Sequence, residues 1–195
     1  MLRTALAAAL ALALLVMPGL AQAQLELKPA LGLTYTSLSK NPVSGTYSAQ
    51  VGYQFGLTVL YGETLYVEGG LLYARKNLGF TETSSHAKFD TGVSGLRIPA
   101  MVGFHILGAP KDFFALRVFG GGAAFIVADV TAPGLTKSNF TSPTWGVFAG
   151  AGVDVAFLFV DLAYEWSLTD YSSLSTVDVG KSRSFYANAG VKIVF

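Results

Sequence analysis

The stretch VDLAYEWSL, residues 160–168, alternates strictly between two kinds of side chain. Every even position is apolar, and every odd position is small, polar or acidic. Because successive side chains on a β-strand point to opposite faces, the stretch predicts a strand with one apolar face and one face that carries Asp161 and Glu165. A helix has a period of 3.6 residues and does not produce this pattern.

The same alternation recurs along the chain in eight segments, which predicts an all-β protein. Each segment is longer than the usual strand of a soluble protein. Their length suits membrane strands, which need about 9–11 residues within the hydrocarbon plus flanks. The predicted strands cover residues 25–38, 46–60, 65–78, 93–107, 113–131, 144–157, 159–172 and 183–195.

The composition of the 195-residue chain points the same way. Hydrophobic residues make up 52% and charged residues only 13%, whereas soluble domains carry about 25% charged residues. This argues against disorder and against an ordinary cytosolic domain. The chain has no cysteine, which excludes disulfides, thiolate metal ligands and a cysteine nucleophile.

The first 23 residues have the features of a secretory signal peptide. Arg3 precedes an apolar run at 5–17, which is too short to span a bilayer, and an A-x-A cleavage pattern follows at 21–23. We therefore divide the chain into a signal peptide, 1–23, and a barrel domain, 24–195. Removal of the signal peptide leaves equal numbers of acidic and basic residues, so no basic surface for nucleic acid is expected.

The connections between the predicted strands alternate in length. Short ones follow the second, fourth and sixth strands, and longer polar ones follow the others. This alternation is typical of bacterial outer-membrane barrels, whose short turns face the periplasm. We predict an eight-stranded antiparallel up-and-down transmembrane β-barrel in the outer membrane, with exposed loops at 39–45, 79–92, 132–143 and 173–182.

The less apolar face of these strands carries small residues and sparse charges of both signs, so we assign it to the lumen and the apolar face to lipid. A narrow eight-stranded interior is filled by side chains. Buried charges must be paired, which predicts a network of ion pairs that closes the lumen. The predicted members are Lys28, Glu68, Arg97, Arg117, Asp154, Asp161, Glu165 and Lys192, and His105 is expected beside them as a neutral ring.

Pro99 lies inside a predicted strand although proline cannot donate to a β-ladder, so we expect a local bulge there. Tyrosine and tryptophan residues gather near the ends of the predicted strands, where aromatic girdles meet the membrane interfaces.

Several short stretches, taken in order, resemble the PorT-like family of small outer-membrane β-barrels. They are GGLLYARK (69–76), LRIP (96–99), FGGG (119–122) and FVDLAY (159–164) with the following LTD (168–170). The chain departs from that family at Arg117, where an acid is common, and at Arg75, where the residue is usually polar. The resemblance implies the fold and the outer-membrane location, and it does not imply one activity.

Phe195 ends an alternating strand and resembles the C-terminal aromatic residue of bacterial outer-membrane proteins. The resemblance implies that Phe195 is an assembly signal. It also implies the barrel assembly machinery and periplasmic chaperones as partners during insertion, and outer-membrane lipid as the partner of the finished barrel.

Two function classes stand beside a structural or surface-interaction role: a lipid-modifying enzyme, and a narrow pore or secretion accessory. The enzyme would need a nucleophile, a base and an orienting acid, and Ser85, His86 and Asp90 are the nearest match. Adjacent residues on an extended chain point apart, and no known catalytic motif is present. We therefore expect no enzymatic activity, no cofactor and no metal site.

Overall fold

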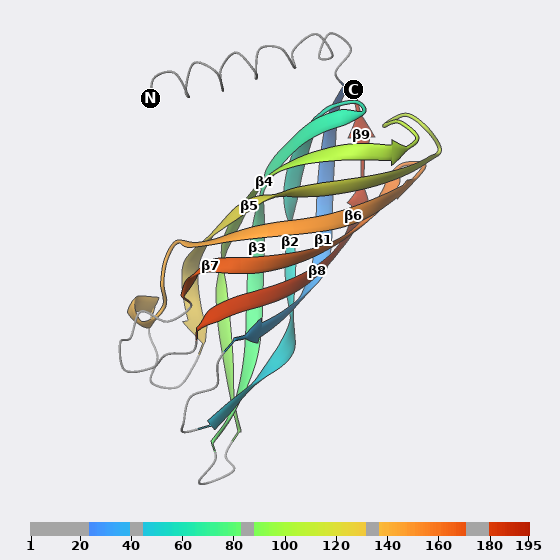
Figure 1. Cartoon of the computed structure of the whole chain (residues 1–195). Helices are drawn as coiled ribbons and strands as arrows, with labels where there is room; N and C mark the ends of the chain where they lie inside the picture. The colour runs from blue at the N-terminus through green and yellow to red at the C-terminus, as the bar shows by residue number, and fades with distance from the viewer. Residues whose placement is uncertain (1–23, 40–44, 83–87, 132–136, 171–179) are drawn as a thin grey trace, which may run out of the picture.

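The computed structural model describes residues 24–39, 45–82, 88–131, 137–170 and 180–195. The predicted signal peptide, 1–23, lies outside these ranges. The described part consists of β-strands and one short 3-10 turn, η2 (Lys137–Asn139) (Figure 1). No helix in these ranges is long and apolar enough to cross a membrane. The strands are β1 (Gln24–Leu38), β2 (Gly45–Gly62), β3 (Leu65–Glu82), β4 (Lys88–Leu107), β5 (Phe114–Thr131), β6 (Thr144–Val155), β7 (Leu158–Asp170), β8 (Lys181–Val191) and β9 (Ile193–Val194).

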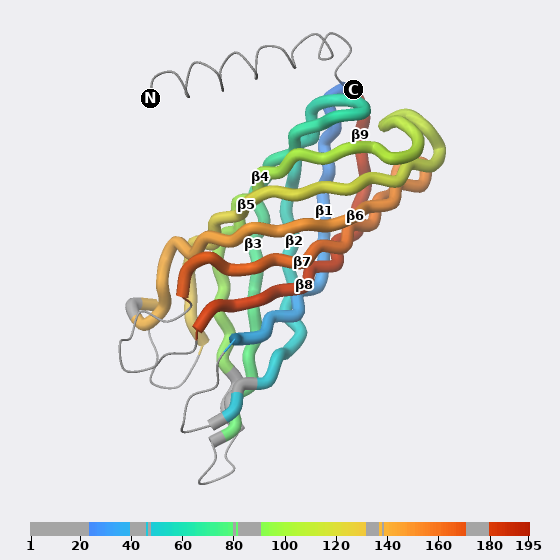
Figure 2. The backbone as a smooth tube through the Cα atoms, viewed as in Figure 1, coloured from blue at the N-terminus to red at the C-terminus, as the bar shows by residue number. Residues whose placement is uncertain are grey.

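The sheet closes on itself. Each strand pairs antiparallel with the next, and β1 pairs with both β2 and β8 (Figure 2). β9 continues β8 after an interruption at Lys192 and pairs with β1 at Glu26 and Val194, so β8 and β9 act as one strand. Around the barrel wall each strand therefore has a paired neighbour on both sides, as a hydrocarbon environment requires. The prediction of an eight-stranded antiparallel up-and-down barrel is confirmed.

The two ends of the barrel differ. Short turns at 63–64, 108–113 and 156–157 lie at one end, together with the start of β1 and the C-terminus (Figure 1). We call this the turn end. The opposite end, which we call the loop end, carries η2 and the remaining connections. In outer-membrane barrels the short turns face the periplasm, so the loop end faces the exterior.

The bounds of the predicted 79–92 loop are wrong. β3 continues to Glu82 and β4 already begins at Lys88, so the two strands form a long hairpin. The stretch is predicted as a loop because it is a long polar connection between two alternating segments. Its threonines and phenylalanines favour strands, however, and backbone pairing between the two strands continues outward from the barrel. Residues 83–87 lie outside the described ranges.

The other three predicted loops are described only in part. Strands take up Gly45 of the 39–45 loop and the last two residues of the 173–182 loop. The 132–143 loop contains η2. The parts of these loops that lie outside the described residues are 40–44, 132–136 and 171–179.

The wall has its apolar face outward, as predicted. On β7, Leu162 and Trp166 are 47% and 44% exposed, whereas Asp161 and Glu165 are 6% and 7% exposed. In a soluble barrel the apolar side chains would fill the interior instead. The outer surface is therefore suited to hydrocarbon, and ten buried acidic and basic side chains among the described residues face the lumen.

The bulge expected at Pro99 is absent from the described strands. The register between β3 and β4 is the same on both sides of Pro99, and Pro99 itself lies opposite Ala123 on β5. If Gly69 on β3 carried a Cβ atom, the nearest atom to it would be the carbonyl oxygen of Pro99. Glycines at 69 and 70 give the β3 backbone conformational freedom beside Pro99, which has no N–H to donate. The register therefore does not have to shift.

The tight turn between β6 and β7 holds Ala156 at a φ of 54°, a left-handed conformation that residues with a Cβ rarely adopt. We predict that Ala156→Gly raises the free energy of unfolding by about 1 kcal/mol, because glycine relieves this strain. Urea titration of the barrel folded into lipid vesicles measures the change. Ala151→Gly, on the adjoining strand β6, is the matched control and should lower stability. Equal losses in both variants would contradict the prediction.

Candidate functional site

Charged side chains fill the turn-end half of the lumen around Arg117, which is completely buried on β5. Its Nη2 lies 2.7 Å from Oδ1 of Asp161 and 3.0 Å from Oδ1 of Asp154, and its Nε also donates to Asp154 at 3.0 Å. Nη1 lies 3.8 Å from Oε2 of Glu68. One guanidinium thus bridges three carboxylates that come from β3, β6 and β7. We call the group centred on it, with Lys28 and Lys192, the turn-end cluster.

Two lysines on neighbouring strands, Lys28 on β1 and Lys192 between β8 and β9, complete the turn-end cluster. Nζ of Lys28 lies 3.1 Å from Glu68 and 3.4 Å from Asp161. Nζ of Lys192 lies 3.5 Å from Asp154 and donates a 2.7 Å hydrogen bond to the carbonyl oxygen of Pro110, in the turn between β4 and β5. Lys192, in the interruption between β8 and β9, therefore binds the β4–β5 turn on the other side of the barrel.

A second ionic group lies nearer the middle of the lumen, and we call it the central cluster. Arg97 approaches Oε2 of Glu165 through Nη2 at 2.8 Å and through Nε at 3.1 Å. Tyr186 donates to the other carboxylate oxygen at 3.0 Å, and Nζ of Lys76 lies 3.6 Å from it. The Arg97 guanidinium also lies over the Tyr186 ring, 4.4 Å from its centroid, which adds a cation–π contact.

The eight residues expected in the lumen network all lie there, and two further ionisable residues join them. Glu26 and Lys76 are 1% and 2% exposed. With them, the buried ionisable side chains of the described strands include five acids and five bases, so the lumen is balanced in formal charge. The sequence alternation already indicates that both residues face the lumen, because Glu26 shares the face of Lys28 on β1 and Lys76 shares the face of Glu68 on β3.

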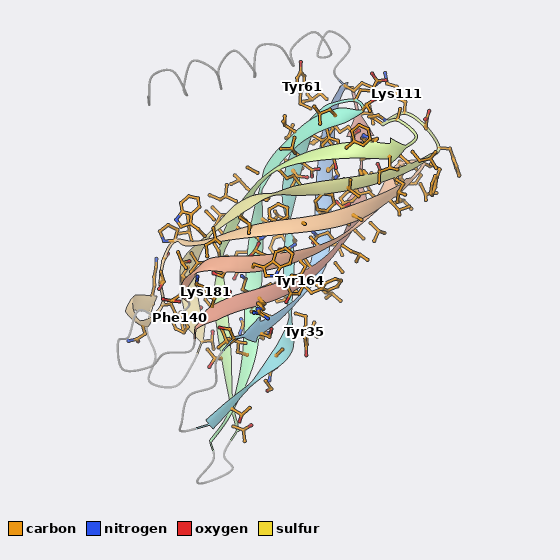
Figure 3. All side chains as sticks on the ribbon, viewed as in Figure 1. Tyr35, Tyr61, Lys111, Phe140, Tyr164 and Lys181 are labelled. Atoms are coloured by element: carbon orange, nitrogen blue, oxygen red, sulfur yellow. The ribbon has the colours of Figure 1, made fainter. Side chains whose placement is uncertain are left out.

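The loop end of the lumen is closed by apolar side chains. We call this group the loop-end apolar cluster. The connection between β5 and β6 contributes to it, and the backbone N–H of Val127 donates to Oγ of Ser142 in that connection at 3.1 Å. Figure 3 shows Phe140 at this end of the barrel. The cluster consists of Ala74, Leu78, Val93, Phe125 and Val127, with Leu38, Val130 and Phe140 packed against it.

A cavity of about 30 Å³ lies between the two ionic clusters. Its lining includes Glu68 and Asp161 on one side and Arg97 on the other, with Phe119 and Phe148 between them. This volume holds one or two water molecules. It is far smaller than the 300–1,000 Å³ typical of a ligand pocket.

The remaining sequence-derived candidates take part in none of these ion pairs, although His105 on β4 lies opposite Arg117 on β5. His105 is buried beside Tyr66, and its Nδ1 lies 2.6 Å from the carbonyl oxygen of Glu63. Ser85 and His86 lie outside the described residues. No group of three or more histidine, aspartate or glutamate side chains in the described ranges is arranged to hold a metal ion. Phe195 is 68% exposed, and its backbone N–H donates to Leu25 at 2.9 Å.

The turn-end cluster predicts a large effect of Arg117→Gln. Removing this guanidinium leaves Asp154 and Asp161 buried beside each other without their shared partner, so the free energy of unfolding should fall by about 3–5 kcal/mol. Urea titration in lipid vesicles measures it. Lys111→Gln, at an exposed turn position, should change stability by less than about 0.5 kcal/mol. Equal stabilities of the two variants would show that Arg117 contributes nothing to the network.

Comparison with known proteins agrees with the geometry. A family model described as "Outer membrane protein beta-barrel domain" matches residues 20–173. The outer membrane protein OprG from Pseudomonas aeruginosa has a similar structure, with a TM-score of 0.54 and 15% identity over 88% of this chain and 95% of OprG. Neisserial surface protein A (NspA) gives a TM-score of 0.56 and 14% identity over 88% of this chain and 97% of NspA. At these identities the likeness shows the fold alone. No curated protein sequence matches the chain.

Proposed function

This chain belongs to the outer membrane protein beta-barrel domain family, and we propose that it is a closed barrel with a structural or surface-interaction role, not an open channel. The observation that carries this proposal is the packing of the lumen. Two ionic clusters and an apolar cluster succeed one another from the turn end to the loop end. The cavity between the ionic clusters has room for only one or two water molecules.

An interaction role would reside at the loop end. The long β3–β4 hairpin extends there, and β2 pairs with it as far as Gly45 opposite Glu82. β1, by contrast, pairs with β2 only as far as Thr36 opposite Gln50. Three strands therefore rise beyond their neighbours on one side of the rim. The ordered strand backbone gives the exposed connections a rigid base, as is usual for binding loops on a scaffold.

The alternatives receive less support. A pore or secretion accessory needs an open path through the lumen. The two ionic clusters and the loop-end apolar cluster lie across the lumen. An enzyme needs its reacting groups close together, and nothing among the described residues favours one. The closer resemblance to PorT-like barrels, and assembly through Phe195 by the barrel assembly machinery and periplasmic chaperones, remain predictions.

Planar-bilayer recording tests the closed lumen. The purified, refolded protein should give no stable conductance steps, because a permeating ion would have to displace paired charges from a low-dielectric interior. An open porin inserted under the same conditions is the positive control. Reproducible steps from the unmodified barrel would overturn the proposal.

The absence of enzymatic activity has its own test. His86→Ala should leave the mass spectrum of the lipid A extracted from expressing cells unchanged, because we assign His86 no chemistry. The matched control is the spectrum from cells that do not express the protein. A modification that depends on expression and disappears in the variant would instead establish the enzyme.

A further inference from the structure

The lipid-facing side of β8 changes character along its length. Its outward residues are charged near the loop end, aromatic in the middle and small toward the turn end. In chain order they are Lys181, Arg183, Phe185, Ala187 and Ala189. Lys181 and Arg183 are exposed on the outer wall, unlike the ion-paired charges of the lumen.

The two alanines form the floor of a groove between β1 and β7. Both neighbouring strands place larger apolar side chains directly opposite the alanines, so the groove has two walls. With strands about 4.8 Å apart, its walls are about 10 Å apart, which accommodates a hydrocarbon chain. A concavity of about 460 Å³ with an almost wholly apolar lining includes both alanines and extends across β1 to Tyr53 and Phe55 on β2. The walls are Leu31 and Leu33 on β1, and Val160 and Leu162 on β7.

The groove leads toward the two cations. Phe185 lies between Tyr35 and Tyr164 on the adjacent strands, and Arg183 lies between Ser37 and Trp166. Tyr35, Tyr164 and Lys181 are labelled on this side of the barrel in Figure 3. Tyrosine and tryptophan mark the membrane interface, so the cations lie at the depth of lipid headgroups.

Neither cation is neutralised by the wall. Lys181 pairs in the ladder with Asp170, yet within the described ranges no ion pair or side-chain hydrogen bond holds the Lys181 ammonium or the Arg183 guanidinium. Guanidinium and ammonium groups bind phosphate oxygens through charge-assisted hydrogen bonds. A single ligand with a phosphate headgroup and an acyl chain complements the cations and the groove together.

We propose that the outward face of β8, between β1 and β7, binds a phosphate-bearing lipid of the outer leaflet. Arg183 and Lys181 hold the phosphate, the Tyr35–Phe185–Tyr164 row contacts the interfacial part of the lipid, and one acyl chain lies over Ala187 and Ala189. The site is on the outer wall and does not depend on whether the lumen conducts.

The two tryptophans of the chain provide a built-in test. Trp166 lies beside Arg183, whereas Trp145 faces outward on β6, two strands from β8, and serves as the reference. Trp145→Phe leaves Trp166 as the only tryptophan, and Trp166→Phe leaves Trp145 as the only one. Each variant is folded into phosphatidylcholine vesicles that contain a minor fraction of phosphatidylglycerol with brominated acyl chains, and quenching gives the relative association constant of the two lipids.

We expect phosphatidylglycerol to be favoured about fivefold at Trp166 and not at Trp145, since one basic group at a membrane surface contributes about that factor. Arg183→Gln combined with Lys181→Gln should remove the preference. Ala189→Leu should reduce it by filling the groove, whereas Ala151→Leu, an exposed alanine on β6, should leave it unchanged. Far-ultraviolet circular dichroism and heat-modifiable gel mobility establish that each variant is folded.

Several results would overturn the proposal. One is an equal preference at both tryptophans, which would indicate a general surface charge effect. A second is full competition by inorganic phosphate, which would leave no role for the acyl groove. A third is quenching at Trp166 that falls for both lipids as the protein-to-lipid ratio rises, which would show that a second copy of the barrel covers this face.

Discussion

The alternation of side chains between two faces of a strand is the constraint on which the rest of the molecule depends. In hydrocarbon every backbone N–H and C=O must find a partner within the protein, so the sheet has to close. An eight-stranded closure leaves an interior only wide enough for side chains. Every second residue is therefore committed to that interior, and each charge placed there has to meet its opposite. The turn-end cluster around Arg117 is the direct result.

The sequence was sufficient for the fold because this alternation can be read locally. The strands, the short turns and the apolar outer wall follow from a period of two and from loop lengths. The lumen residues follow from the same parity, which would also have yielded Glu26 and Lys76 had it been extended to the strand ends. The pairings could not be derived. That Arg117 bridges Glu68, Asp154 and Asp161 depends on strand tilt and register, which no single strand encodes.

Where prediction failed, long-range pairing overrode a local signal. The polar composition of 79–92 suggested a loop, yet the two strands continue because each supplies the other with hydrogen-bond partners. At Pro99 the missing donor suggested a bulge. The flexible glycines on β3 absorb the irregularity instead, and the register is preserved. The loop-end apolar cluster was not foreseen either, because it combines residues of four strands with Phe140 from the connection after β5.

Lys192 shows how one side chain can favour the correct strand register at the seam where the barrel closes. The ammonium group reaches Asp154 and the carbonyl oxygen of Pro110 only from its present position on the last strand. A slip of one residue at the closing seam would turn this ammonium toward lipid near the turn-end interface, at a cost of up to about 1 kcal/mol, and would also break both contacts. A slip of two would return it to the interior but away from both partners. Lys192 thus favours a single register between β1 and the last strand, and this register sets the stagger of the closed barrel.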